Sequence, residues 1–133
     1  MNIKLLRHLL DAGLLPVLSP VSRSTDPAMG ATLNVNGDDA AAAIAAALGA
    51  EELLLVSDVP GVLLGERSVP ALGPEDAQRL IDDGTARGGM AAKLQAALSA
   101  LDGGVQRVRI SDIAAITDPN RGTALTRVGS MAV

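Results

Sequence analysis

The chain has 133 residues, of which 48% are hydrophobic and 20% are charged, and its net charge is −4. This length suits one globular domain, and the mild acidic balance supplies no basic patch for nucleic acid or for an anionic membrane surface. No apolar run is long enough to span a membrane, and the lack of cysteine excludes disulfides and thiol catalysis and suits a reducing, cytoplasmic compartment.

The first quarter of the chain predicts a helix, a strand, a loop and a second strand. Apolar residues recur at helical spacing over 2–12, and Gly13 ends that helix. Residues 14–18 are apolar and predict a short strand. Residues 19–30 predict a loop or loose hairpin because Ser, Pro and Asp are frequent there, and 31–35 predict the strand that follows.

Residues 33–64 are the most informative stretch, with a polar loop, a helix, a buried strand and a second polar loop. The alanine-rich run predicts a helix over 40–48, with Asp38 or Asp39 as its N-cap. The four apolar residues 53–56 are typical of a strand buried on both faces of a parallel sheet. Both polar loops then lie beyond the same edge of the sheet, where ligands bind in open α/β sheets.

The second half of the chain repeats the alternation of strands and helices. The predicted elements are an apolar turn at 62–65, an exposed loop or hairpin at 66–73, a helix from Pro74 to about 82, a flexible connection at 83–89, a helix at 90–101, a strand at 105–110, a capped turn at Ser111-Asp112, a loop at 118–123 and a short strand at 124–128. This order indicates a parallel or mixed sheet covered by helices on both faces.

A Gly-Gly pair followed by a lysine is the second notable feature. Gly88 and Gly89 allow a ligand to approach the backbone closely, and a helix that begins there presents free amides to an anion. Lys93, one turn further, adds a positive charge suited to a phosphate. From this stretch alone, phosphate binding and an ordinary helix after a flexible linker are equally weighted. Asp58, after the buried strand, is either a nucleotide contact or a turn former.

Other catalytic signatures are missing from the sequence. It has no Walker loop, no GxGxxG after a strand, no HExxH, no GxSxG and no Cys/His metal set. The single histidine, His8, lies in an amphipathic helix, where packing is favoured over catalysis. Phe, Tyr and Trp are absent, so a bound base would have to lie between aliphatic side chains.

Five segments occur in a fixed order: LPVLSP at 15–20, NVNGDDAA at 34–41, SDVPGV at 57–62, GGMAAK at 88–93 and GT at 122–123. Together they resemble the C-terminal, nucleotide-binding half of the amino acid kinase family, and within it the acetylglutamate kinases. The sequence departs from the family pattern at Gly37, where alanine is usual, and at Ser111-Asp112, where a glycine-containing turn is usual.

The resemblance implies a three-layer α/β/α sandwich with a mainly parallel sheet, present here as one nucleotide-binding domain over 1–133 without the family's N-terminal amino-acid-binding half. It implies ATP-dependent phosphorylation of the side-chain carboxylate of N-acetyl-L-glutamate, in arginine biosynthesis, with Mg²⁺ accompanying ATP. Homo-oligomers are possible, and the chain alone is expected to have little activity.

The resemblance also assigns roles to residues. Asp38 would orient the catalytic lysines, and Lys93 would neutralise charge on the ATP phosphates. Asn34 and Asn36 would bind the acylated amino acid, and no side chain is assigned as a metal ligand. The nucleotide-binding residues would be Ser57, Asp58, Val59, Gly61, Gly88, Gly89, Met90 and Lys93. Two alternatives stay open: a non-catalytic nucleotide-binding or structural module, and a sister kinase for a carrier-linked aminoadipate.

Overall fold

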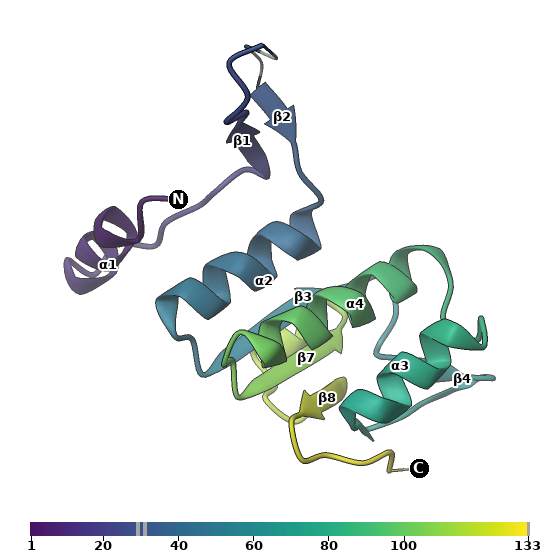
Figure 1. Ribbon diagram of the computed structural model, residues 1–133. Coiled ribbons are helices and arrows are strands. Elements are labelled where there is room, and N and C mark those ends of the chain that lie inside the picture. Colours follow the sequence, from purple (N-terminus) through teal and green to yellow (C-terminus); the bar gives the residue numbers. More distant parts are fainter. Residues whose placement is uncertain (29, 31, 133) are drawn as a thin grey trace.

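A computed structural model describes residues 1–28, 30 and 32–132 (Figure 1). Both helices and strands form along this length, as the sequence predicts. In chain order they are α1 (Ile3–Asp11), β1 (Val21–Arg23), β2 (Thr32–Asn34), α2 (Gly37–Leu48), β3 (Glu52–Val56), β4 (Leu63–Leu64), β5 (Arg67–Ser68), β6 (Ala71–Leu72), α3 (Pro74–Asp82), α4 (Gly88–Asp102), β7 (Arg107–Ser111), the 3₁₀ turn η1 (Ile113–Ile116) and β8 (Thr123–Thr126).

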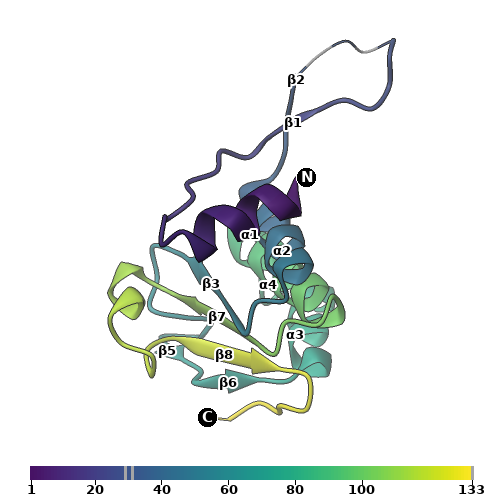
Figure 2. The ribbon, with the colours of Figure 1, turned by 90° about the vertical axis from the view of Figure 1, so that its left-hand side faces the viewer.

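A four-stranded sheet in the order β3-β7-β8-β6 forms the centre of the fold (Figure 2). β3 is parallel to β7, β7 is antiparallel to β8, and β8 is parallel to β6. In this register Ile110 of β7 lies between Leu55 of β3 and Thr123 of β8. The predicted α/β class with a mainly parallel sheet is therefore confirmed.

Helices α2, α3 and α4 lie together on one side of the sheet, with α4 between the other two (Figures 1 and 2). The second helical layer predicted on the opposite face is not seen among the described residues, where α1 contacts α2 and the 3₁₀ turn η1 lies against Arg109 on that face. Side chains alternate along β7, so the fully buried Val108 and Ile110 point into the core beneath the helices, whereas Arg109 points to the opposite face. The buried core cluster consists of Ala, Leu, Val and Ile, as a chain without aromatic residues requires.

The start of α2 differs from the prediction. The helix begins at Gly37, and its N-cap is Asn36, not Asp38 or Asp39. The side-chain oxygen of Asn36 accepts hydrogen bonds from the backbone amides of Asp38 (2.9 Å) and Asp39 (3.3 Å). The carboxylate of Asp38 therefore takes no part in capping. Gly49 ends the helix in a left-handed conformation (φ 67°), as predicted.

The strand β3 is not buried on both faces, because helices α2, α3 and α4 cover only one face of the sheet and Val56 lies on the other. Leu55 is 3% exposed, but Val56 is 41% exposed. No strand in the described part of the chain pairs with the outer edge of β3. An apolar run indicates that a strand forms but contains no information on which faces of the sheet other elements cover, and this explains the error.

The strand predicted over residues 14–18 does not form. This segment has no regular secondary structure, and Leu15 and Val17 are 86% and 90% exposed. No described strand lies beside it to take up its backbone hydrogen bonds. β1 and β2 pair as the loose hairpin that the sequence indicated. Ala31, at the start of the strand predicted over 31–35, lies outside the described residues.

The exposed loop or hairpin predicted over 66–73 is right in the hairpin and wrong in the exposure of the residues that follow it. β4 and β5 form a small hairpin, and β6 enters the main sheet parallel to β8. Val69 and Leu72 are 2% and 0% exposed, so this segment contributes to the core. Strands of two residues are too short to show alternation in the sequence, and the prediction had no pattern on which to rest.

The helix α3 has the predicted bounds, whereas α4 starts two residues early, at Gly88. The two glycines are thus the first turn of α4 and not part of a linker. Gly88 has φ 52°, a conformation that glycine adopts without strain. β7 and β8 form in the predicted regions with shifted ends. None of the described helices is long and apolar enough to cross a membrane.

Candidate functional site

Asp38 and Lys93 form an ion pair that joins the first turn of α2 to α4. The Nζ atom of Lys93 lies 2.9 Å from Oδ1 and 3.2 Å from Oδ2 of Asp38. The side chains are 17% and 22% exposed for Lys93 and Asp38, so solvent screens this pair less than a surface pair. Because an ammonium group carries three N–H donors, Lys93 keeps the capacity to bind a second anion.

The side chain of Lys93 also lines a cavity of about 700 Å³, a size suited to a small-molecule ligand. One wall of the cavity comes from the loop that follows β3, and another comes from the start of α4. The predicted site residues in its lining are Ser57, Asp58, Val59, Gly89, Met90 and Lys93. The structure thus brings the strand-end loop and the Gly-Gly-Lys motif to one place, and the ion pair adds Asp38.

The first turn of α4 borders this cavity with features that favour an anion. Arg87, the N-cap residue, makes no side-chain hydrogen bond to the amides of that turn. A Cβ atom on Gly89 would meet no atom within 4 Å, so the packing of the protein does not require glycine there. An uncapped helix N-terminus beside open space, with Lys93 close by, suits a negatively charged ligand.

Seven further residues line the cavity and were not predicted as site residues: Val56, Val62, Leu63, Leu80, Thr85, Ala86 and Arg87. Most of them make an aliphatic wall, the type of surface that the lack of aromatic side chains led us to expect. Their chemistry is too ordinary to mark them in a sequence. For residues 85–87 a positional signal did exist, because they connect α3 directly to the Gly-Gly motif.

Five predicted site residues do not line the cavity themselves. Asp38 is connected to it only through Lys93, and Asn36 caps α2. Asn34 lies exposed in β2. Gly61 approaches a neighbouring strand, since a Cβ atom on it would lie 2.7 Å from Oγ1 of Thr123. Gly88 provides the backbone turn before Gly89.

A metal ion would find few protein ligands here. The described residues contain no group of three or more His, Cys, Asp or Glu side chains that could hold a metal. Asp58 is the carboxylate in the cavity lining, and Ser57 donates a hydrogen bond to it (3.3 Å). One carboxylate fits a Mg²⁺ ion that keeps water ligands and takes its remaining oxygens from a bound phosphate.

A sequence profile described as the amino acid kinase family matches residues 1–112, which include Asp38, Asp58 and Lys93. The chain belongs to the amino acid kinase family.

Curated relatives within this family are acetylglutamate kinases. The chain is 43% identical over 122 residues to the acetylglutamate kinase of Roseiflexus sp. (strain RS-1). The match covers 92% of this chain and 44% of the relative. It is 47% identical over 113 residues to the acetylglutamate kinase of Paracoccus denitrificans (strain Pd 1222). That match covers 84% of this chain and 36% of the relative. The chain therefore spans less than half the length of these relatives.

Solved structures share the fold. The N-acetylglutamate synthase from Neisseria gonorrhoeae, complexed with coenzyme A and L-arginine, matches with a TM-score of 0.84 and 27% identity, over 96% of this chain and 31% of that one. The carbamate kinase from Giardia lamblia bound to citric acid matches with a TM-score of 0.75 and 19% identity. This match covers 95% of this chain and 43% of the carbamate kinase. At that identity the second match supports the fold alone.

Proposed function

We propose that this chain is the nucleotide-binding half of an acetylglutamate kinase, which transfers a phosphoryl group from ATP to the side-chain carboxylate of N-acetyl-L-glutamate in arginine biosynthesis. One observation carries the proposal: Lys93 pairs with Asp38 and also lines the cavity that contains Asp58. The names of the curated relatives support the choice of substrate.

The cavity residues suit the parts of a nucleotide. Lys93 and the amides at the start of α4 would bind the phosphate oxygens, while Asp38 holds the ammonium group of Lys93 in place. The aliphatic wall would take the base. Mg²⁺ would arrive on the phosphates, with Asp58 as the nearby carboxylate, and would neutralise part of the phosphate charge.

The acceptor chemistry needs little else from this half of the enzyme. A substrate carboxylate is already ionised at neutral pH, so no general base is required, and catalysis rests on positioning and on cations where charge develops. Asn34 is the proposed contact for the acylated amino acid. The side-chain oxygen of Asn36 is engaged in capping α2, so Asn36 would reach a substrate only through its amide nitrogen. The cytoplasm is the proposed location, and self-association stays a prediction.

Calorimetric titration of the chain with Mg-ADP tests the proposal. The wild-type chain is expected to bind, and Lys93→Ala and Asp58→Ala are each expected to weaken binding by tenfold or more, as losing a charge-assisted contact does. Lys4→Ala, an exposed lysine on α1, is the matched control and should bind as the wild type does. No binding by the wild type at millimolar Mg-ADP would instead favour a structural module.

Activity assays separate the enzyme alternatives. The chain alone is expected to form little acyl phosphate, because it spans less than half of its relatives and so lacks much of the surface that surrounds a transferring group. A full-length enzyme that carries this segment should prefer N-acetyl-L-glutamate. Preference for a carrier-linked aminoadipate would identify a sister kinase.

A further inference from the structure

The loop that follows β3, residues 57–62, brings Ser57, Asp58 and Val59 to the cavity; we call it the Asp58 loop. Three hydrogen bonds join its backbone to Ser111 and Thr123, and a fourth runs from the amide of Val69 to the carbonyl of Val62. Both of these residues are 0% exposed, and neither lines the cavity. The loop is therefore fixed from behind, on the side away from the ligand space.

The hydroxyl of Thr123 holds the end of the loop. Its Oγ1 atom accepts a hydrogen bond from the amide of Val62 (2.8 Å) and donates one to the carbonyl of Val69 (2.5 Å). Val62 and Val69 are 1% and 2% exposed, so water cannot replace these contacts. A side chain without the hydroxyl would leave a buried donor and a buried acceptor unpaired.

Ser111 holds the start and the middle of the same loop. Its carbonyl accepts a hydrogen bond from the amide of Ser57 (2.7 Å), and its Oγ atom donates one to the carbonyl of Pro60 (3.2 Å). Ser111 ends β7, and its neighbour Ile110 pairs with Thr123 at the start of β8. The three contacts therefore come from the adjoining ends of two paired strands, which form a rigid base.

Close packing at two glycines leaves this base no room to shift. A Cβ atom on Gly61 would lie 2.7 Å from Oγ1 of Thr123, and one on Gly122 would lie 2.9 Å from Oγ of Ser111. Real Cβ atoms do not approach oxygen this closely. The backbone of the loop therefore lies directly against the strand ends that hold it.

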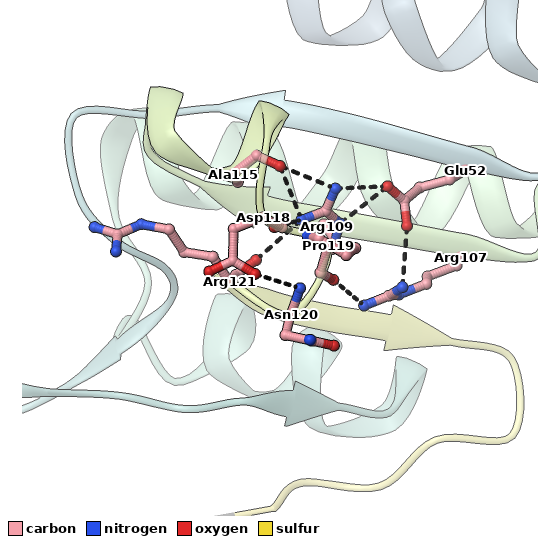
Figure 3. Close-up of polar contacts among 8 residues, drawn as sticks. All are labelled: Glu52, Arg107, Arg109, Ala115, Asp118, Pro119, Asn120 and Arg121. Carbon is pink, nitrogen blue, oxygen red and sulfur yellow. Dashed lines mark hydrogen bonds and ion pairs between the residues drawn. The ribbon is translucent and has the colours of Figure 1, made fainter.

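A buried arginine fixes the segment that leads into Thr123 (Figure 3). Arg109 is 5% exposed, and its guanidinium group donates to the carbonyl oxygens of Ala115 (3.3 Å), Asp118 (2.9 Å) and Arg121 (3.2 Å). It also donates to the carboxylate of Glu52 in β3 at 2.7 and 2.9 Å. One side chain thus joins β3, β7 and the segment before β8 on the face opposite the helices.

We infer that Thr123 and Ser111 are positioning residues, whose hydroxyl groups fix the Asp58 loop and so set where Asp58 lies relative to Lys93 in the shared cavity. The inference rests on the proposed function, since it concerns the binding of Mg-ADP in that cavity. Their hydroxyls act through the loop backbone and not on the ligand, because both are buried outside the cavity lining.

The test compares variants that keep or lose the hydroxyl. Thr123→Val removes it at nearly constant volume, and Thr123→Ser keeps it. Val105→Ala, a fully buried residue before β7 at the opposite end of the strand, serves as a control for general loss of stability. Ser111→Ala is a milder second variant should Thr123→Val fail to fold. Each chain is titrated with Mg-ADP at a temperature where circular dichroism shows it folded.

Thr123→Val is expected to raise the dissociation constant of Mg-ADP about tenfold, because it leaves a buried donor and a buried acceptor unpaired. Thr123→Ser keeps the hydroxyl, and its dissociation constant should stay within about threefold of the wild type. Val105→Ala should bind as the wild type does. In an Asp58→Ala background the effect of Thr123→Val should largely disappear, because coupled residues are not additive. Hydrogen exchange of residues 57–62 should speed up in Thr123→Val and not in Val105→Ala.

The outcomes separate the two claims. No binding by the wild-type chain overturns the proposed function and this inference with it. Binding by the wild type with equal losses in Thr123→Val and Val105→Ala overturns the inference alone, as does an unchanged effect of Thr123→Val in the Asp58→Ala background.

Discussion

The Nζ atom of Lys93 lies 2.9 Å from Oδ1 of Asp38, a residue 55 positions earlier in the chain. The contact forms because α2 and α4 pack side by side on the sheet, so that the first turn of α2 lies beside the second turn of α4 (Figure 1). It links the two polar segments that sequence analysis selected independently, the loop before α2 and the Gly-Gly-Lys motif.

Asp38→Asn is expected to lower the free energy of unfolding by about 1 kcal/mol, because it leaves a partly buried ammonium group without a charged partner. Asp39→Asn is the matched control, since Asp39 is its neighbour in the same turn and is exposed. It should change stability by less than about 0.5 kcal/mol. Urea denaturation measures both, and equal effects would show that the ion pair with Lys93 contributes nothing.

Gly89→Ala is expected to weaken Mg-ADP binding about tenfold while leaving the chain as stable as the wild type or more so. The added methyl group enters the open space beside the first turn of α4, and alanine lowers the conformational entropy of the unfolded chain. Gly37→Ala is the control, as its Cβ atom also meets nothing within 4 Å but lies outside the cavity lining. Unchanged affinity in Gly89→Ala would argue against a ligand at this turn.

Asn36→Ala is expected to destabilise the chain by about 1 kcal/mol, the usual cost of losing an N-cap. Asn36→Asp keeps a capping oxygen and should recover most of this loss. Asn34→Ala, an exposed position in β2, should leave thermal unfolding almost unchanged. If the Asn36 and Asn34 variants unfold alike, the cap on α2 is not a significant source of stability.

The decrease in the free energy of unfolding at low pH should depend in part on Asp76. The hydrogen bond from the amide of Met131, with further hydrogen bonds from Gly73 and Arg79, holds the pKa of Asp76 below its ordinary value near 3.8. A lowered pKa in the folded state favours folding above the unfolded value and loses this effect as the pH falls through the folded value. Asp76→Asn should therefore cost stability at pH 7 and progressively less as the pH falls below 3.8, as judged by denaturation over a series of pH values.

Local patterns in the sequence predicted the parts of this fold that local chemistry determines. The bounds of α3 follow from Pro74 and the acids after it, and the end of α2 follows from Gly49. The strand predicted over residues 14–18 does not form, and the strand β6 was not predicted. Both errors have one physical reason. Whether an apolar segment forms a strand depends on the presence of a partner strand, and nothing in five residues reports it.

The grouping of the candidate site residues in space was predicted to a similar degree, and their roles stay predictions. Asp58, Gly89 and Lys93 carry chemistry that is visible in the sequence, and they lie together at one cavity. Thr123 and Ser111 could not be predicted as positioning residues from the sequence, since hydroxyl residues at strand ends are common. Their importance depends on the distance to backbone atoms about 50 to 60 residues away, which only the tertiary structure shows.

A core and a cavity wall built without aromatic rings also decide how this protein can be observed. The chain contributes almost no absorbance or fluorescence between 250 and 300 nm. Adenine absorbs in that window, so a circular dichroism band near 260 nm that appears when ADP is added would come from the nucleotide alone. A chiral pocket that imposes optical activity on the base could thus be followed by spectroscopy on the unlabelled protein.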